Sequence, residues 1–115
     1  AVTVSSENHF FYCLVAHGSA VRELSNDPQL GERIAANFRS AELPKKQEEL
    51  LNFTKKLTKD PSEIGENDRN KLRDVGYTDR DIWDISAIVG LFNMTNRLAS
   101  ATEMEPNNNY HNLAR

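Results

Sequence analysis

The chain of 115 residues contains one cysteine, which excludes an internal disulfide framework. No run approaches the roughly 20 apolar residues that a membrane-spanning helix requires, and no signal peptide is visible. The formal net charge is -3, whereas duplex-binding proteins normally carry a basic excess. A Gly-rich phosphate loop, a Ser-centred elbow and a paired-carboxylate motif are also missing. We therefore expect a reduced, cytoplasmic protein with no cofactor and with no membrane or nucleic-acid partner.

Helical periodicity dominates what is present. The first stripe steps by four and three through Phe10, Leu14, His17, Val21 and Leu24. It predicts a helix from Asn8 to Leu24 whose N-terminal cap is Ser5, Ser6 or Asn8. Asp27 and Pro28 then have the residue types of an N-cap and a first helical position, so we expect a short helix to start there.

Two more helices are expected in the middle of the chain. One opens at Glu42-Leu43-Pro44 and ends at Asp60-Pro61. A short one around Asp68 to Val75 stops at Gly76, a typical left-handed C-terminal residue.

The last helix starts with a capping-box pattern of Thr78 and Asp81. One of its stripes comprises Ile82, Ile85, Val89, Phe92, Asn96 and Ala99. A second comprises Ile88, Leu91, Thr95 and Leu98. A helix that is apolar on more than one face is central in its domain or buried between subunits, and we favour a subunit contact for part of it. A polar tail follows from Pro106 to Asn109. The chain is thus predicted to be a single all-α domain that forms homo-oligomers.

Cys13 and His17 are the residues most suited to chemistry. Their spacing of four places them on one helix face, and Cys13 lies near the predicted N-terminus, where the helix dipole favours an anion. Such settings lower the pKa of a thiol to roughly 3.5–7.5 and make the sulfur nucleophilic. The structural alternative is a buried, inert cysteine beside a hydrogen-bonded core histidine.

Two other functions fit the residues less well. A zinc site needs more ligands than this pair, with His9 better explained as a loop or cap residue and His111 as a solvated tail residue, so no metal is expected. Residues 68–98 have the helix-turn-helix order of DNA-binding proteins. Asp79, Asp81 and Asp84 would, however, meet the phosphates at the start of the recognition helix.

The segment from Ser5 to Gly18 resembles the signature of alkylhydroperoxidase D-like (AhpD-like) proteins, within the carboxymuconolactone decarboxylase-like superfamily. The stretches 76–85, 91–99 and 104–111 resemble its branch of uncharacterised peroxidase-related enzymes. The resemblance implies an AhpD-like helical bundle, assembled as trimers or hexamers. It also implies that residues 1–115 are the C-terminal part of the full-length domain, with further helices upstream.

The family motif is Cys-x-x-Cys-x-x-x-His, with a glutamate on the preceding helix. By resemblance, Cys13 matches the peroxide-attacking cysteine and His17 the histidine of the proton relay, while Phe10 replaces the resolving cysteine. The position of the glutamate falls before Ala1. Tyr12 and Phe10 are candidate pocket residues.

Three hypotheses follow. The first is a one-cysteine peroxidase in which Cys13 attacks a peroxide and an external thiol reduces the resulting sulfenic acid. The second is a cofactor-free enzyme of the decarboxylase type that uses His17. The third is a non-catalytic oligomeric module with an inert Cys13.

Overall fold

The computed structural model describes residues 1–112, and every regular element in that range is helical. In chain order the elements are α1 (Val2–Glu7), α2 (Phe11–Ser25), α3 (Leu30–Asn37), the 3-10 turn η1 (Phe38–Ala41), α4 (Lys45–Lys59), η2 (Pro61–Glu63), α5 (Glu66–Asp74), α6 (Asp79–Ala101) and η3 (Asn108–His111). The expected all-α class is confirmed. Among these helices, none combines the length and the apolar character needed to cross a membrane.

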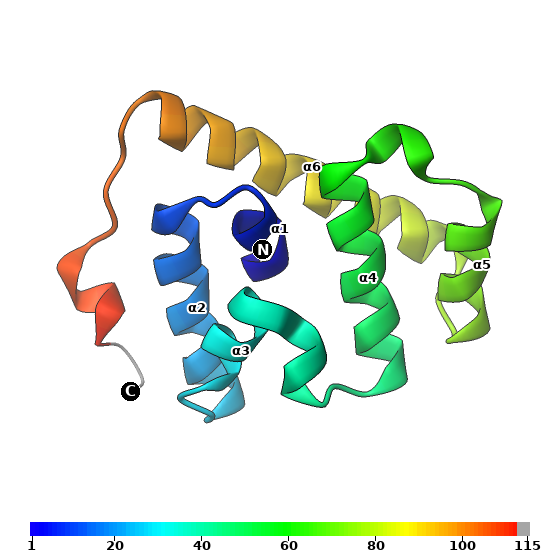
Figure 1. Ribbon diagram of the computed structural model, residues 1–115, viewed down its shortest axis with the longest axis horizontal. Coiled ribbons are helices and arrows are strands. Elements are labelled where there is room, and N and C mark those ends of the chain that lie inside the picture. The colour runs from blue at the N-terminus through cyan, green and yellow to red at the C-terminus, as the bar shows by residue number, and fades with distance from the viewer. Residues whose placement is uncertain (113–115) are drawn as a thin grey trace.

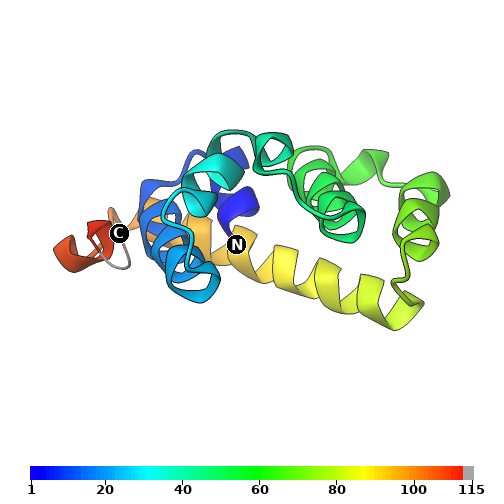
Figure 2. The same ribbon diagram turned by 90° about the horizontal axis from the view of Figure 1, so that it is seen from below.

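The shortest α-helix, α1, is the centre of the packing. Its residues Val2, Thr3, Val4 and Ser5 are all buried, and it contacts α2, α3, α4 and α6. Figure 1 shows α1 between α2 and α4, with α6 crossing above them. In the view turned by 90°, α6 lies on one side of α1 while α3 and α4 lie on the other (Figure 2).

The chain breaks between α1 and α2, where the sequence predicted one helix starting near Asn8. Ser5 and Ser6 lie inside α1 and do not cap α2. The chain turns at His9, whose φ is 53°, and Phe10 is the extended N-cap of α2 with no side-chain cap hydrogen bond. Because the ring of Phe10 is only 9% exposed, its burial stabilises the turn in place of a polar cap.

The start of α3 also differs from the prediction. The helix begins at Leu30, and the carboxylate of Asp27 accepts a hydrogen bond from the Gln29 N–H at 2.9 Å. Asp27 therefore closes a local turn ahead of the helix instead of capping it. Leu24, the last position of the predicted α2 stripe, is 86% exposed. Leu14, His17 and Val21 of that stripe are half-buried, and the buried residues of α2 are Cys13, Gly18, Ser19 and Arg22.

α2 and α3 approach each other closely at a pair of glycines, Gly18 and Gly31. A Cβ on Gly31 would lie 2.9 Å from the carbonyl oxygen of Gly18 and 3.2 Å from its Cα. Both atoms belong to the backbone, so this packing requires that Gly31 have no side chain.

Most expected boundaries in the second half of the chain are confirmed, but α5 begins at Glu66 and not near Asp68. α4 ends at Lys59 with Asp60 as its C-cap, and α5 is followed by Gly76, whose φ is 103°. At the start of α6 the Thr78 hydroxyl accepts from the Asp81 N–H at 3.1 Å. The Thr78 N–H donates in turn to the Asp81 carboxylate at 2.9 Å.

α6 presents two different faces. The inner one packs on the bundle through its buried residues Ile82, Val89, Asn96 and Ala99. The outer face keeps large side chains about half exposed, namely Ile88 (52%), Leu91 (48%), Met94 (53%) and Leu98 (59%). The predicted subunit contact of this face stays a prediction.

The segment after α6 folds back onto α2, whereas the sequence predicted a solvated polar tail. Pro106 is buried, and Arg22 of α2 donates from Nη2 to the Tyr110 carbonyl at 3.0 Å. The ring of His111 lies 5.7 Å from that of Phe11, so His111 is anchored despite its exposure.

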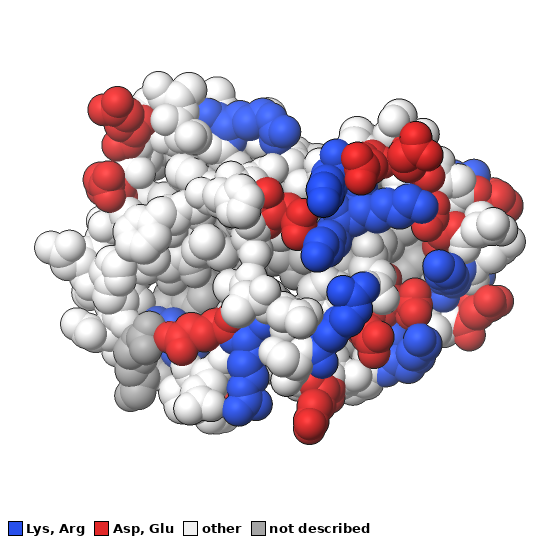
Figure 3. Space-filling view, in the orientation of Figure 1, with Lys and Arg blue, Asp and Glu red and all other residues white. Residues whose placement is uncertain are grey.

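Charged side chains gather over α4 and α5, while the surface around α2 and the end of α6 carries fewer (Figure 3). Lys56 pairs with Asp68 at 2.9 Å and joins α4 to α5. Arg73 pairs with Asp79 at 2.7 Å and joins α5 to α6. Each of these two ion pairs links two helices. Cys13, by contrast, lies in an apolar cluster with Phe10 and Ala99.

Candidate active site

Cys13 and His17 lie on α2, one helical turn apart. Cys13 is the third residue of the helix and is 5% exposed. It shares a buried cluster with Phe10 and Ala99, against which Tyr12 packs. The sequence thus located the thiol correctly near the N-terminus of a helix, and the fold covers it with apolar groups.

That burial raises the pKa of the Cys13 thiol above its ordinary value, against the depressed pKa expected from the sequence. The Ser5 hydroxyl, a hydrogen-bond partner of the thiol, acts in the opposite direction by favouring the thiolate. Desolvation is the larger effect, so Cys13 rests as a protonated thiol near neutral pH.

His17 is held as a neutral imidazole. Burial lowers its pKa, and the nearby carbonyl of Cys13 opposes that shift only in part. Nδ1 is buried and makes no hydrogen bond of normal geometry with any described residue. The imidazole packs edge-on against Phe92 of α6, with ring centroids 5.0 Å apart. A neutral imidazole carries one unprotonated nitrogen, and that nitrogen is able to accept a proton.

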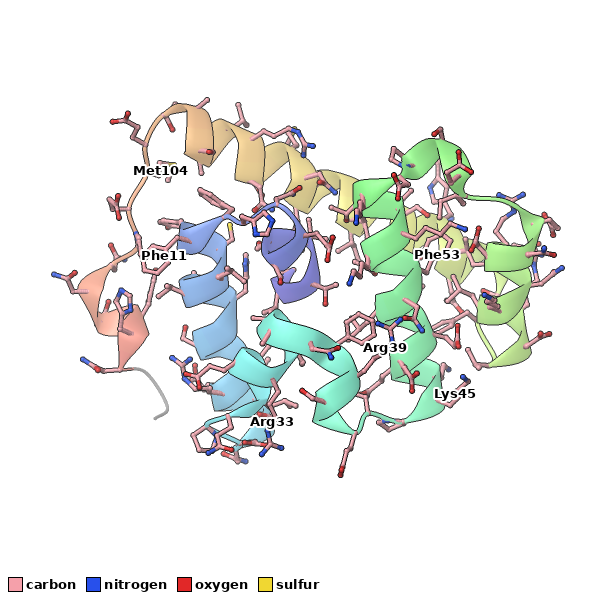
Figure 4. The ribbon with its side chains drawn as sticks, viewed as in Figure 1. Phe11, Arg33, Arg39, Lys45, Phe53 and Met104 are labelled. Atoms are coloured by element: carbon pink, nitrogen blue, oxygen red, sulfur yellow. The ribbon has the colours of Figure 1, made fainter. Side chains whose placement is uncertain are left out.

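Phe10 and Tyr12 lie between the thiol and an open hollow at the start of α2. Their rings stack with centroids 6.2 Å apart. Both line a hollow of about 530 Å³, together with His9, Phe11, Ala99, Ser100, Glu103, Met104 and Glu105. Figure 4 shows Phe11 and Met104, which approach this region from α2 and from the segment after α6. Phe10 is therefore both a wall of the hollow and a cover of Cys13.

Two buried polar residues at the thiol are not predicted by the sequence. Ser5 is 0% exposed and Asn96 is 2% exposed, and the Ser5 hydroxyl donates to Asn96 Oδ1 at 3.2 Å. Ser5 fits a helix cap, and Asn96 occupies a position in an otherwise apolar stripe. The amide in that stripe is the one signal that would have identified it.

The remaining histidines do not join the pair. His9 is exposed at the turn before α2, and His111 lies in η3 against Phe11. Within residues 1–112, no group of three or more His, Cys, Asp or Glu side chains is arranged to hold a metal ion.

A second hollow lies away from the thiol, between η1, α4 and α5. Its volume is about 280 Å³, and its lining comprises Arg39, Glu49, Asn52, Phe53, Lys56, Asp68 and Lys71. Figure 4 places Arg39 beside α4 and Phe53 on it. The carboxylates here are already paired, Glu49 with Lys45 and Asp68 with Lys56.

Solved structures that are similar to this chain include two peroxidase-related proteins. A crystal structure of an uncharacterized peroxidase-related protein from Silicibacter sp. TM1040 is 57% identical, with a TM-score of 0.97. An uncharacterized peroxidase-related protein from Ralstonia eutropha JMP134, described as an alkylhydroperoxidase AhpD core, is 37% identical, with a TM-score of 0.94. No family model and no curated protein sequence matches the chain.

Each match covers 99% of this chain and 60% of the relative, so the chain spans about three fifths of their length. The chain belongs to the AhpD-like superfamily.

Proposed function

We propose that this chain carries the reactive half of a one-cysteine, thiol-dependent peroxidase. The observation that carries the proposal is the Cys13–His17 pair at the start of α2, with a thiol that can ionise beside a neutral imidazole. The relatives named peroxidase-related support the same coarse class.

The chemistry starts with transfer of the Cys13 proton toward His17. The thiolate sulfur then attacks the terminal oxygen of a hydroperoxide R–OOH, the S–O bond forms and the O–O bond breaks. Cys13 becomes a sulfenic acid, and the leaving RO⁻ takes the proton from His17 to become ROH. The sulfur loses two electrons, which the peroxide gains.

Reduction requires an external thiol, because Phe10 stands where a resolving cysteine would be. A thiol R′–SH condenses with the sulfenic acid to a mixed disulfide and water. A second R′–SH releases Cys13 and leaves as the disulfide R′–S–S–R′. A reducing cytoplasmic compartment would supply this reductant.

The proposal includes assembly into trimers or hexamers through α6. Four large apolar side chains on its outer face are about half exposed in the single chain. Burial of apolar surface stabilises association by about 25 cal/mol per Å² before the entropic costs of binding.

The direct test is peroxide consumption with a monothiol reductant, for the wild type and for Cys13→Ser. The wild type should consume peroxide in a protein-dependent way, and Cys13→Ser should fall to the background rate. His17→Ala should slow turnover and leave Cys13 available to alkylating reagents. Equal consumption by the wild type and Cys13→Ser would refute the proposal.

A non-catalytic oligomeric module is the second candidate. The raised pKa of Cys13 and its 5% exposure favour it, because a protonated, covered thiol is a poor nucleophile. In that case Cys13 would alkylate slowly up to high pH, and peroxide would leave it unmodified.

A further inference from the structure

The side chain of Asn96 has an unusual position for an amide. It lies on the inner stripe of α6, one turn after Phe92, and is 2% exposed. Its Oδ1 accepts from Ser5, but its Nδ2 is buried without a hydrogen-bond partner among residues 1–112. A buried donor without an acceptor destabilises the fold. We therefore look for a second state of the site in which Asn96 Nδ2 has an acceptor.

Ser5 connects this amide to the thiol. Its hydroxyl donates to Asn96 Oδ1 at 3.2 Å, and it is also a hydrogen-bond partner of Cys13. A hydroxyl has one proton and two lone pairs, so it can donate to only one of these neighbours at a time. The direction of its hydrogen bond therefore depends on what Cys13 requires.

We propose that Asn96 is a positioning residue that acts through Ser5 to stabilise the ionised sulfur of Cys13. This inference rests on the proposed function for its purpose, because a thiolate is needed only if Cys13 reacts. Neither Asn96 nor Ser5 touches the peroxide in this account.

In the thiol state the hydrogen bonds run toward the amide. Ser5 O–H donates to Asn96 Oδ1 at 3.2 Å, so Ser5 Oγ has only lone pairs left, and we assign the Cys13 S–H as their donor. The Asn96 Nδ2 is left over, as the structure shows.

In the thiolate state the same groups fit with their direction reversed. The Ser5 hydroxyl rotates and donates to the sulfur. The lone pairs of Ser5 Oγ then have no donor. Half a turn about the Asn96 Cβ–Cγ bond exchanges Oδ1 with Nδ2, and the amide then donates to Ser5 Oγ. No proton is transferred within this chain of groups. Nδ2 gains Ser5 Oγ as its acceptor when the negative charge forms, while Oδ1 takes the buried position that Nδ2 leaves.

Other charges near the sulfur must be kept constant in a test. His17, one turn along α2, is the titratable side chain of the pair. Substitutions of Ser5 and Asn96 leave it in place and add no charge of their own.

The experiment measures the alkylation rate of Cys13 by iodoacetamide against pH, in the wild type, Ser5→Ala, Asn96→Leu and the double variant. The midpoint should move to higher pH in each variant. A shift of one unit lowers the rate about tenfold at pH values below the midpoint. The double variant should match Ser5→Ala alone, because Asn96 acts only through Ser5. Ser5→Thr, which keeps the hydroxyl, should retain the wild-type midpoint.

Asn93→Leu is the matched control, because Asn93 is on α6 but hydrogen-bonds Asn8 instead of Ser5. It should leave the midpoint unchanged. If Asn96→Leu does not fold by circular dichroism, Asn96→Ala takes its place. An unchanged midpoint in the folded Asn96 variant would overturn the proposal, as would shifts that add in the double variant. Alkylation needs no peroxide, so this outcome is independent of whether the peroxidase assay fails.

Discussion

Phe10 packs against Cys13 and closes the buried cluster around the thiol. The same ring forms part of the wall of the open hollow at the start of α2. The residue that stands where the family motif has a cysteine therefore also controls access to the remaining cysteine. A peroxide that enters through the hollow must displace or pass this ring.

Phe10→Ala should expose Cys13 and raise its alkylation rate several-fold at a fixed pH. It should also destabilise the fold by about 3–5 kcal/mol, as is usual when a buried Phe is truncated. Phe53→Ala is the matched control, because Phe53 is 5% exposed but belongs to a separate cluster with Leu72 and Ile82. The control should lose similar stability without the gain in alkylation. A similar gain in both variants would show that Cys13 is reached by unfolding and not through Phe10.

His17 should make stability depend on pH. Because burial lowers its pKa in the folded chain, the unfolded chain binds the proton more readily. The contribution of neutral His17 to the free energy of unfolding is thus fully present above the unfolded pKa of about 6.5. It is progressively lost as pH falls toward the lowered pKa of the folded chain. Between about pH 7 and about pH 5, the free energy of unfolding measured with urea should therefore decrease less for His17→Gln than for the wild type. The same decrease in both would contradict the assigned state of His17.

Gly31 and Gly90 should respond oppositely to alanine. Gly31→Ala places a Cβ against the Gly18 backbone and should cost about 1–3 kcal/mol through overpacking. Gly90 lies within α6, and a Cβ there would meet nothing within 4 Å. Gly90→Ala should stabilise the helix by about 0.5–1 kcal/mol. Thermal unfolding of the two variants checks both signs, and a stabilised Gly31→Ala would contradict the close approach of α2 and α3.

The outer face of α6 should hold subunits together. Leu91→Glu introduces a charge at its centre and should shift the protein to monomers in sedimentation velocity. Leu24→Glu is the control, because Leu24 is 86% exposed on α2 and away from this face. A wild type that sediments as a monomer, or a Leu91→Glu variant that stays assembled, would contradict the proposed interface.

Helical periodicity predicted the α-class and most helix boundaries from Lys45 onward, because the stripes, Gly76 and the Thr78–Asp81 capping box are local signals. The break between α1 and α2 could not be predicted, since it depends on the burial of Phe10 in a cluster that includes Ala99 of α6. The same applies to the anchored position of His111.

Within the candidate site, the pair on α2 could be found from its spacing and from the family resemblance. The direction of the pKa shift of Cys13 could not be predicted from the sequence. The helix position of Cys13 favours a thiolate, but Phe10 at the N-cap and Ala99 of α6 pack on it, and this burial reverses the direction of the pKa shift. Ser5 and Asn96 were missed because their contact joins residues 91 positions apart in the chain.

Trapping of a sulfenic acid on Cys13 shows directly whether this thiol reduces a hydroperoxide. The reduced protein is treated with a stoichiometric hydroperoxide in the presence of dimedone, and the adduct is located by mass spectrometry. We expect a dimedone adduct on Cys13 that forms faster as pH rises and more slowly in His17→Ala. A Cys13 that remains unmodified by peroxide, yet alkylates normally with iodoacetamide under the same conditions, would contradict it.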